Sequence, residues 1–166
     1  MLDGTFSLTD HDGNAVTEAS YRGRFMLIYF GFTHCRKVCP RSLACMTAAL
    51  DELGDAAGRI VPLYITVDPE RDTPETMKIF LEANFPRFTG LTGSREAIDR
   101  AKASFRVFTR KGPDPEDAEG YAVPHTAFAY LLGPDGTYLT HFMDTADSGK
   151  MAGGLRDMLA KAGATA

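Results

Sequence analysis

Two short, unbroken runs of apolar residues constrain the fold of this chain more than any other feature. They are Phe25–Phe32 and Ile60–Val67, and such runs are typical of strands buried on both faces. Between them, apolar residues recur at helical spacing from Cys39 to Leu53 and stop at Gly54. This strand–helix–strand order predicts an α/β fold.

Two hairpins extend the predicted sheet. Turn signals join Thr5–Asp10 to Ala15–Val16 at the N-terminus, and Ala127–Leu132 to Tyr138–Phe142 near the C-terminus. Together with the alternating strands and helices before them, they predict a mixed central sheet with helices on both faces and an N-terminal β-hairpin.

Further helices are predicted from their capping signals. Thr73 and Ser94 precede helical apolar stripes, and Pro74 suits a first helical position. A last helix is expected from Ser148 to Ala162, weakened by the glycines at 153 and 154.

Two segments are expected to depart from regular structure. Pro62 within the second apolar run indicates an edge strand or a bulge. The stretch Arg110–Gly120 has two prolines, two glycines and four acidic residues, which is typical of an exposed loop. Its flanks are too short to fold separately, so residues 1–166 are expected to form one domain.

Composition narrows the function classes. Hydrophobic residues are 44% and charged residues 24%, as in soluble globular domains, and the net charge of −4 gives no general attraction to nucleic acid. No apolar run is long enough to span a bilayer. A monomer is the expected state, because no unusually apolar surface pattern can be recognised.

Cys35 and Cys39 are the strongest candidates for a functional site. They follow a buried strand and enter a helix, and in open α/β sheets sites form beyond the carboxyl ends of the strands. A spacing of four places both sulfurs on one side of a helical turn. The helix start, with Arg36, Lys37 and Arg41, favours thiolates, which are both nucleophiles and metal ligands.

The spacing leaves redox and metal chemistry open. It is one residue longer than the Cys-x-x-Cys pattern of thiol oxidoreductases, and a disulfide at this spacing requires a distorted helix start. A metal tolerates the wider spacing but requires a further ligand. Two thiolates with one imidazole would suit copper, and zinc as well.

Four histidines could supply that ligand. His11 is interpreted as a solvated loop residue, His34 as a residue that lines the site, and His141 as an exposed or half-buried strand residue. His125 precedes a predicted buried strand, where a loop can approach the cysteines. By itself it is a weak candidate.

Other reactive side chains have simpler interpretations. Asp68 and Glu70 are expected in a solvated turn, and Asp72 is expected to help cap the following helix. Cys45 is interpreted as a bystander, since it faces away from the other cysteines on a helix. Met46 belongs to the apolar stripe.

Several motifs resemble those of the Sco/SenC family, and their order and spacing agree with that family over nearly the whole chain, from about Thr5 to Leu159. The matching segments are Tyr29–Pro40 with its two cysteines, Val67–Pro74 (VDPERDTP), Phe88–Gly93, His125–Phe128 and Leu132–Gly136.

The resemblance implies a thioredoxin-like fold and one copper ion per chain, Cu(I) or Cu(II), bound by Cys35, Cys39 and His125. It implies a metallochaperone that helps to assemble the dinuclear copper centre of cytochrome c oxidase. The implied partners are subunit II of the oxidase and a copper donor protein. The implied location is the bacterial periplasm, with an N-terminal anchor in the inner membrane; the mitochondrial intermembrane space is the second choice.

Two positions differ from the family pattern. Arg36-Lys37 stands where the family commonly has Pro-Asp, which favours thiolates and opposes a bound cation, and Pro124 replaces an Asp before the histidine. A thiol–disulfide oxidoreductase is therefore the alternative function, with Cys35 attacking and Cys39 resolving. A peroxidase of the peroxiredoxin kind is disfavoured, because that family needs Thr three residues before the reactive cysteine, and this chain has Phe32 and Arg36 at those positions.

Overall fold

The computed structural model describes residues 3–33, 38–107, 112–114, 117–122, 128–142 and 147–164. Its longer elements alternate between strands and helices, with short 3₁₀ helices at Glu18–Tyr21 and Gly54–Arg59. The strands and α-helices are β1 (Ser7–Asp10), β2 (Ala15–Thr17), β3 (Phe25–Gly31), α1 (Val38–Leu53), β4 (Ile60–Thr66), α2 (Pro74–Asn84), β5 (Thr89–Thr92), α3 (Arg95–Phe105), β6 (Gly112–Asp114), β7 (Asp117–Ala122), β8 (Ala129–Leu132), β9 (Tyr138–Phe142) and α4 (Ser148–Ala164).

Seven strands form one mixed sheet in the order β2-β1-β5-β4-β3-β8-β9. The central strands β3, β4 and β5 are parallel, whereas the β1–β2 and β8–β9 hairpins add antiparallel strands at either side. The predicted mixed sheet and both predicted hairpins are confirmed. The carboxyl ends of the three parallel strands meet at one edge of the sheet, where sites of α/β proteins form.

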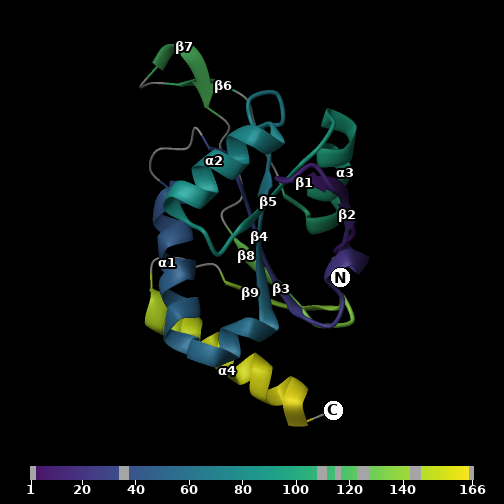
Figure 1. Ribbon diagram of the computed structural model, residues 1–166, viewed down its shortest axis with the longest axis vertical. Helices are drawn as coiled ribbons and strands as arrows, with labels where there is room; N and C mark the ends of the chain where they lie inside the picture. Colours follow the sequence, from purple (N-terminus) through teal and green to yellow (C-terminus); the bar gives the residue numbers. More distant parts are fainter. Residues whose placement is uncertain are drawn as a thin grey trace.

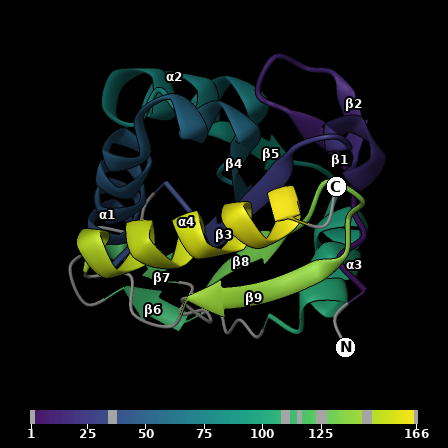
Figure 2. The same cartoon turned by 90° about the horizontal axis from the view of Figure 1, so that it is seen from below.

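Helices cover both faces of the sheet, as predicted. Successive residues of β3 point to opposite faces. Phe25, Leu27 and Tyr29 pack in a core with α1, α2 and α4. Met26, Ile28 and Phe30 pack in a second core with α3 and the β1–β2 hairpin. Figure 1 shows α1 and α3 on opposite sides of the sheet, and Figure 2 shows α4 on the α1 side.

The predicted helix starts are confirmed by their capping hydrogen bonds. The Thr73 hydroxyl accepts from the Thr76 N–H, and Pro74 occupies the first turn of α2. The Ser94 hydroxyl accepts from the Ala97 N–H at the start of α3. Gly54 follows α1 with a φ of +61°, a conformation that favours glycine.

Two expectations about irregular segments were wrong. Pro62 is not in an edge strand and marks no bulge: β4 lies between β3 and β5, and Pro62 pairs in register with Leu27. Pairing of β4 with β5 begins only at Leu63, so the proline precedes that ladder. The stretch Arg110–Gly120 contains strand structure, because β6 and β7 form an antiparallel pair with a register shift at Pro113/Asp114. Figure 1 shows this pair at the opposite end of the molecule from α4.

The two adjacent glycines of α4 have different surroundings, which gives a stability prediction. A Cβ on Gly153 would meet nothing within 4 Å, whereas a Cβ on Gly154 would lie 2.8 Å from Cε1 of Phe142. We expect Gly153→Ala to raise the free energy of unfolding by about 0.5–1 kcal/mol, since glycine destabilises a helix interior. Gly154→Ala should lower it by about 1–3 kcal/mol through overpacking. Urea unfolding of the pair measures this; a stabilised Gly154→Ala would contradict it.

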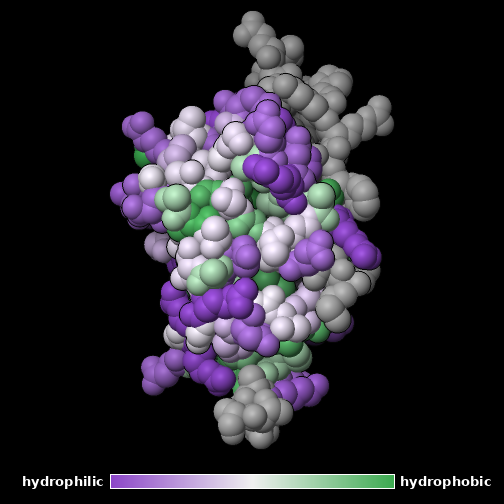
Figure 3. Space-filling view, turned by 90° about the vertical axis from the view of Figure 1, so that its right-hand side faces the viewer, coloured by the Kyte–Doolittle hydropathy of each residue, from purple (hydrophilic) through white to green (hydrophobic). Residues whose placement is uncertain are grey.

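The surface of the described residues is largely polar. Ile79 of α2, with 64% of its area exposed, is the large hydrophobic residue that stands out. The face opposite α1, seen in Figure 3, carries mainly hydrophilic side chains with small hydrophobic areas between them. Within the described residues, no helix has the length and apolarity that crossing a membrane requires.

Candidate functional site at the carboxyl edge of the sheet

The predicted cysteine pair falls on the connection from β3 to α1. Cys39 is the second residue of α1, so it lies in the first turn of that helix, as expected. Cys35 and His125 lie outside the described residues. Among the described residues, no cluster of three His, Cys, Asp or Glu side chains could hold a metal ion.

The chain topology brings the segments before and after these residues to the same edge. β8 is antiparallel to β3, and Ala129 at the start of β8 pairs with Tyr29 near the end of β3. The chain therefore enters β8 at the edge where it leaves β3. His125 is four residues before Ala129, and Cys35 is four residues after Gly31.

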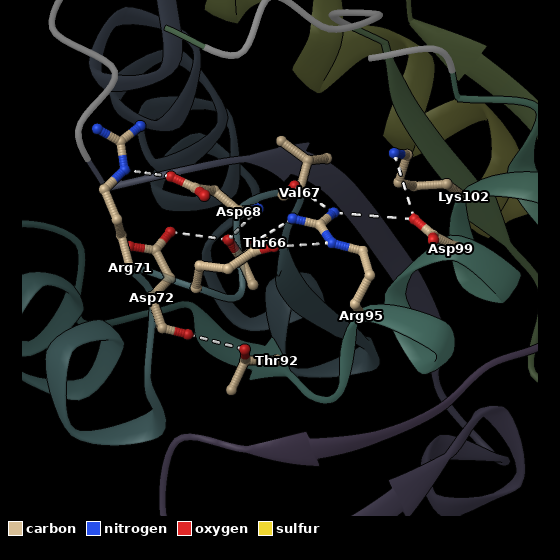
Figure 4. Close-up of polar contacts among 10 residues, drawn as sticks. Thr66, Val67, Asp68, Arg71, Asp72, Thr92, Arg95, Asp99 and Lys102 are labelled. Carbon is tan, nitrogen blue, oxygen red and sulfur yellow. Dashed lines mark hydrogen bonds and ion pairs between the residues drawn. The ribbon is translucent and has the colours of Figure 1, made fainter. Parts of the chain in front are cut away.

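A buried carboxylate lies at this edge. Asp72 is fully buried and accepts three hydrogen bonds from two threonines that end neighbouring strands. The Thr33 N–H donates to Oδ2 at 2.9 Å and the Thr33 hydroxyl donates to Oδ1; the Thr66 hydroxyl donates to Oδ2 at 2.8 Å. Figure 4 shows Asp72 between Thr66 and Thr92.

The backbone of Asp72 is held as firmly as its side chain. Its carbonyl accepts from the Thr92 hydroxyl of β5 at 2.8 Å, and its N–H donates to the Asp68 carbonyl at 2.9 Å. The Asp68 N–H in turn donates to the Thr66 hydroxyl at 2.9 Å. Asp72 therefore connects the ends of β3, β4 and β5. We call Asp72, Thr33, Thr66 and Thr92 the Asp72 network.

Two arginines flank the Asp72 network. Arg71 pairs with the buried Asp68 (Figure 4), and its guanidinium lies over the Phe32 ring at 5.7 Å from the centroid. Arg95 of α3 donates to both carboxylate oxygens of Glu70 and contacts the Val67 carbonyl at 3.5 Å. The segment from Val67 to Thr73 is therefore attached to both β3 and α3.

The expectation of a solvated turn was wrong for Asp68 but is confirmed for Glu70, which is exposed in a turn. Asp68 is 1% exposed and Asp72 is 0% exposed, and both have polar partners in the interior. The side chain that caps α2 is that of Thr73, so the expected contribution of Asp72 to the cap is not observed. The acidic composition suggested solvent, but hydrogen-bond donors from distant strands make burial tolerable.

Burial raises the pKa of Asp72 above its ordinary value, and the nearby Asp68 charge acts in the same direction. The hydrogen bonds from Thr33 and Thr66 oppose this and favour the carboxylate form. A buried carboxyl group with several donors aimed at it fixes the positions of those donors, because an unmade hydrogen bond in the interior is costly.

The other histidines and the third cysteine have structural surroundings. The expectation that His11 is a solvated loop residue was wrong. Its side chain is only 13% exposed, and its Nδ1 accepts from the Gly90 N–H at 3.0 Å. His141 is exposed, as expected, and its Nδ1 is hydrogen-bonded to the Tyr138 hydroxyl. Cys45 of α1 is buried in the core, and Met46 of the same helix is fully buried, so the placement of Met46 in the apolar stripe is confirmed.

Sequence reasoning missed the threonines of the Asp72 network. Thr33, Thr66 and Thr92 each stand at or just past the end of a strand, and each directs its hydroxyl to Asp72. One signal was available: a polar residue repeated where three buried strands end, beside an acidic segment. Spacing along the chain does not show that three such residues converge, so the signal is weak.

Comparison with known proteins identifies the family. Residues 1–160 match the family model described as SCO1/SenC. The chain belongs to the SCO1/SenC family. A human relative, "Protein SCO1 homolog, mitochondrial", is 43% identical over 154 residues, which are 92% of this chain and 51% of that protein. The chain thus spans about half the length of this SCO1 relative. Other relatives include bacterial proteins, one of them a lipoprotein.

Solved Sco structures share the fold. The crystal structure of Arabidopsis thaliana ScoI with copper bound is 33% identical, with a TM-score of 0.90 over 97% of this chain and 99% of that one. A second solved structure is that of BsSco, which is 27% identical. BsSco is a member of the Sco family of cytochrome c oxidase assembly proteins, and a disulfide switch has been identified in it. Its TM-score is 0.73, over 96% of this chain and 94% of that one. The predicted thioredoxin-like fold is confirmed.

Proposed function

We propose that this SCO1/SenC protein binds one copper ion, as Cu(I) or Cu(II), through Cys35, Cys39 and His125. It would act as a metallochaperone for the dinuclear copper centre of cytochrome c oxidase. One observation carries the proposal: β8 starts beside the end of β3, so the segments carrying the histidine and the cysteines attach to one edge of the sheet. The copper-bound ScoI relative supports the choice of metal.

The donor set fits copper. Thiolate sulfur is a soft ligand that suits Cu(I), and imidazole suits copper in both oxidation states. The first turn of α1 contains Cys39, and the positive end of a helix stabilises a thiolate there. Arg41, exposed on the same helix, adds positive charge.

In this role the copper is cargo, and the residues of this chain hold it and release it. Three protein ligands leave the ion open to an incoming ligand, so it can pass to a partner by ligand exchange. The proposed recipient is subunit II of the oxidase and the proposed source is a copper donor protein. The proposed location is the periplasm, with a membrane anchor before the domain described here.

A copper titration of the reduced protein tests this function. We expect one Cu(II) per chain with a strong sulfur-to-copper charge-transfer band, and binding at least about 10-fold weaker in His125→Ala. Removal of a residue that only hydrogen-bonds to a metal ligand already lowers metal affinity by about 10-fold or more, so removal of the ligand itself should cost at least as much. The matched control is His141→Ala, which removes an exposed histidine of β9. A wild-type protein without the band, or equal affinity in His125→Ala, contradicts the proposal.

A second candidate is a thiol–disulfide oxidoreductase, supported by the disulfide switch described for BsSco, although the Cys-x-x-x-Cys spacing is one residue longer than the usual Cys-x-x-Cys. The Cys35 thiolate would attack a disulfide of the partner and form a mixed disulfide. Cys39 would then displace the partner, which leaves with two thiols while Cys35 and Cys39 become a disulfide. Full reductase activity in His125→Ala, with no copper retained, would favour this function over the first.

A further inference from the structure

We propose that Asp72 is a positioning residue for the cysteine pair: its carboxylate fixes Thr33 and so sets where the chain departs toward Cys35. The inference rests on the proposed function, because it concerns the geometry of that same dithiol. Asp72 is not itself assigned as a ligand. It acts through Thr33, on the geometry with which the cysteine segment leaves the sheet.

The first step is the attachment of Thr33. Two hydrogen bonds, from its backbone N–H and from its hydroxyl, end on the two oxygens of one carboxylate. This pair fixes both the backbone position and the side-chain rotamer of Thr33. Cys35 is two residues further along the chain, so covalent geometry limits the distance between the two Cα atoms to about 7 Å. A displacement of Thr33 therefore shifts the point from which the chain runs to Cys35.

The second step is the rigidity of Asp72. Its side chain also accepts from Thr66 of β4, and its carbonyl accepts from Thr92 of β5. It directly precedes Thr73, which caps α2. Thr33 is consequently attached to two central strands and to the start of a helix, all of them buried or bordering the core.

The third step is the cost of this arrangement. Burial raises the pKa of Asp72, which means that the interior disfavours its charge. Apolar side chains of similar volume often stabilise a fold at least as well as buried ionic groups do. The carboxylate supplies what an apolar group cannot, which is a directional hold on two donors of one residue next to the cysteine segment.

The test compares isosteric and conservative variants of Thr33. Thr33→Val removes the hydroxyl donor and keeps the shape, whereas Thr33→Ser keeps the hydroxyl. The matched control is Ser104→Ala. Ser104 is a buried residue of α3, and its hydroxyl also accepts a long-range hydrogen bond, from the Thr5 N–H at 2.6 Å. Asp72→Ala removes both carboxylate oxygens and so all three side-chain hydrogen bonds; if this variant does not fold, Thr33→Val decides.

Two quantities are measured for each variant. The first is Cu(II) binding, given by the dissociation constant and the energy of the charge-transfer band. The second is the redox equilibrium of the Cys35/Cys39 dithiol with glutathione disulfide. In the second, the two cysteines lose two electrons and two protons to one glutathione disulfide, which yields two glutathione thiols. We expect at least about 10-fold weaker copper binding and a shifted band in Thr33→Val, as for lost partners of metal ligands. Thr33→Ser and Ser104→Ala should match the wild type.

The outcomes separate this inference from the proposed function. Normal copper binding, band and redox equilibrium in Thr33→Val overturn the inference and leave the copper function standing. An equal loss in Ser104→Ala also overturns it, since the effect would then be general destabilisation. If the wild type binds no copper, the proposed function fails; the redox equilibrium then decides, and an unshifted value in Thr33→Val overturns the positioning role.

Discussion

Replacing both Cys35 and Cys39 by serine is expected to abolish copper binding. Serine keeps the size of each side chain but removes the thiolate, which is the soft ligand that copper prefers. A single imidazole would remain, so we expect the affinity for copper to fall by more than about 100-fold. Loss of a residue that only hydrogen-bonds to a metal ligand typically costs ~10–100-fold. Competition with a chelator of known affinity measures this.

The matched control for the double variant is Cys45→Ala. Cys45 lies on the same helix as Cys39 but is buried in the core, among residues of α1, α2 and α4. Its replacement should leave copper stoichiometry and the charge-transfer band unchanged. A double serine variant that still shows this band would mean that the copper is held elsewhere on the chain.

Phe30→Ala is expected to cause the largest loss of stability from a single change. Phe30 is fully buried in β3, and its ring centroid lies 5.4 Å from that of Phe105 in α3 and 6.3 Å from that of Tyr130 in β8. Its removal leaves a cavity where the sheet meets α3, so the free energy of unfolding should fall by about 3–5 kcal/mol. Urea unfolding at 25 °C measures the change.

Ile79→Ala is the control for that experiment. Ile79 also loses an apolar side chain, but 64% of its surface is already exposed on α2. Its replacement should change the free energy of unfolding by less than about 0.5 kcal/mol. Similar losses for Phe30→Ala and Ile79→Ala would contradict the two-face packing of β3.

The local elements were predictable because their causes are local. The apolar run Phe25–Phe32 predicted β3, and the caps Thr73 and Ser94 predicted the starts of α2 and α3. Each depends on a few neighbouring residues, such as a hydroxyl three positions from an N–H. The cysteine pair was likewise visible as a candidate from its spacing and its place after a buried strand.

The errors came from residues whose environment is set by distant parts of the chain. Pro62 suggested an edge strand, but β5 places β4 inside the sheet. His11 suggested a solvated loop, but it accepts a hydrogen bond from Gly90, 79 positions away. Asp72 was expected to help cap α2, but its carboxylate accepts instead from Thr33, 39 positions away, in the interior.

The sequence by itself determined the order of strands and helices, the family and the dithiol candidate, since these follow from periodicity, capping and motif spacing. Only the tertiary structure decided that three strand ends converge on one buried carboxylate, and that β8 begins beside the end of β3. The physical reason is that a buried polar group is tolerated only where partners meet it. Which distant partners meet it is determined by the folding of the whole sheet.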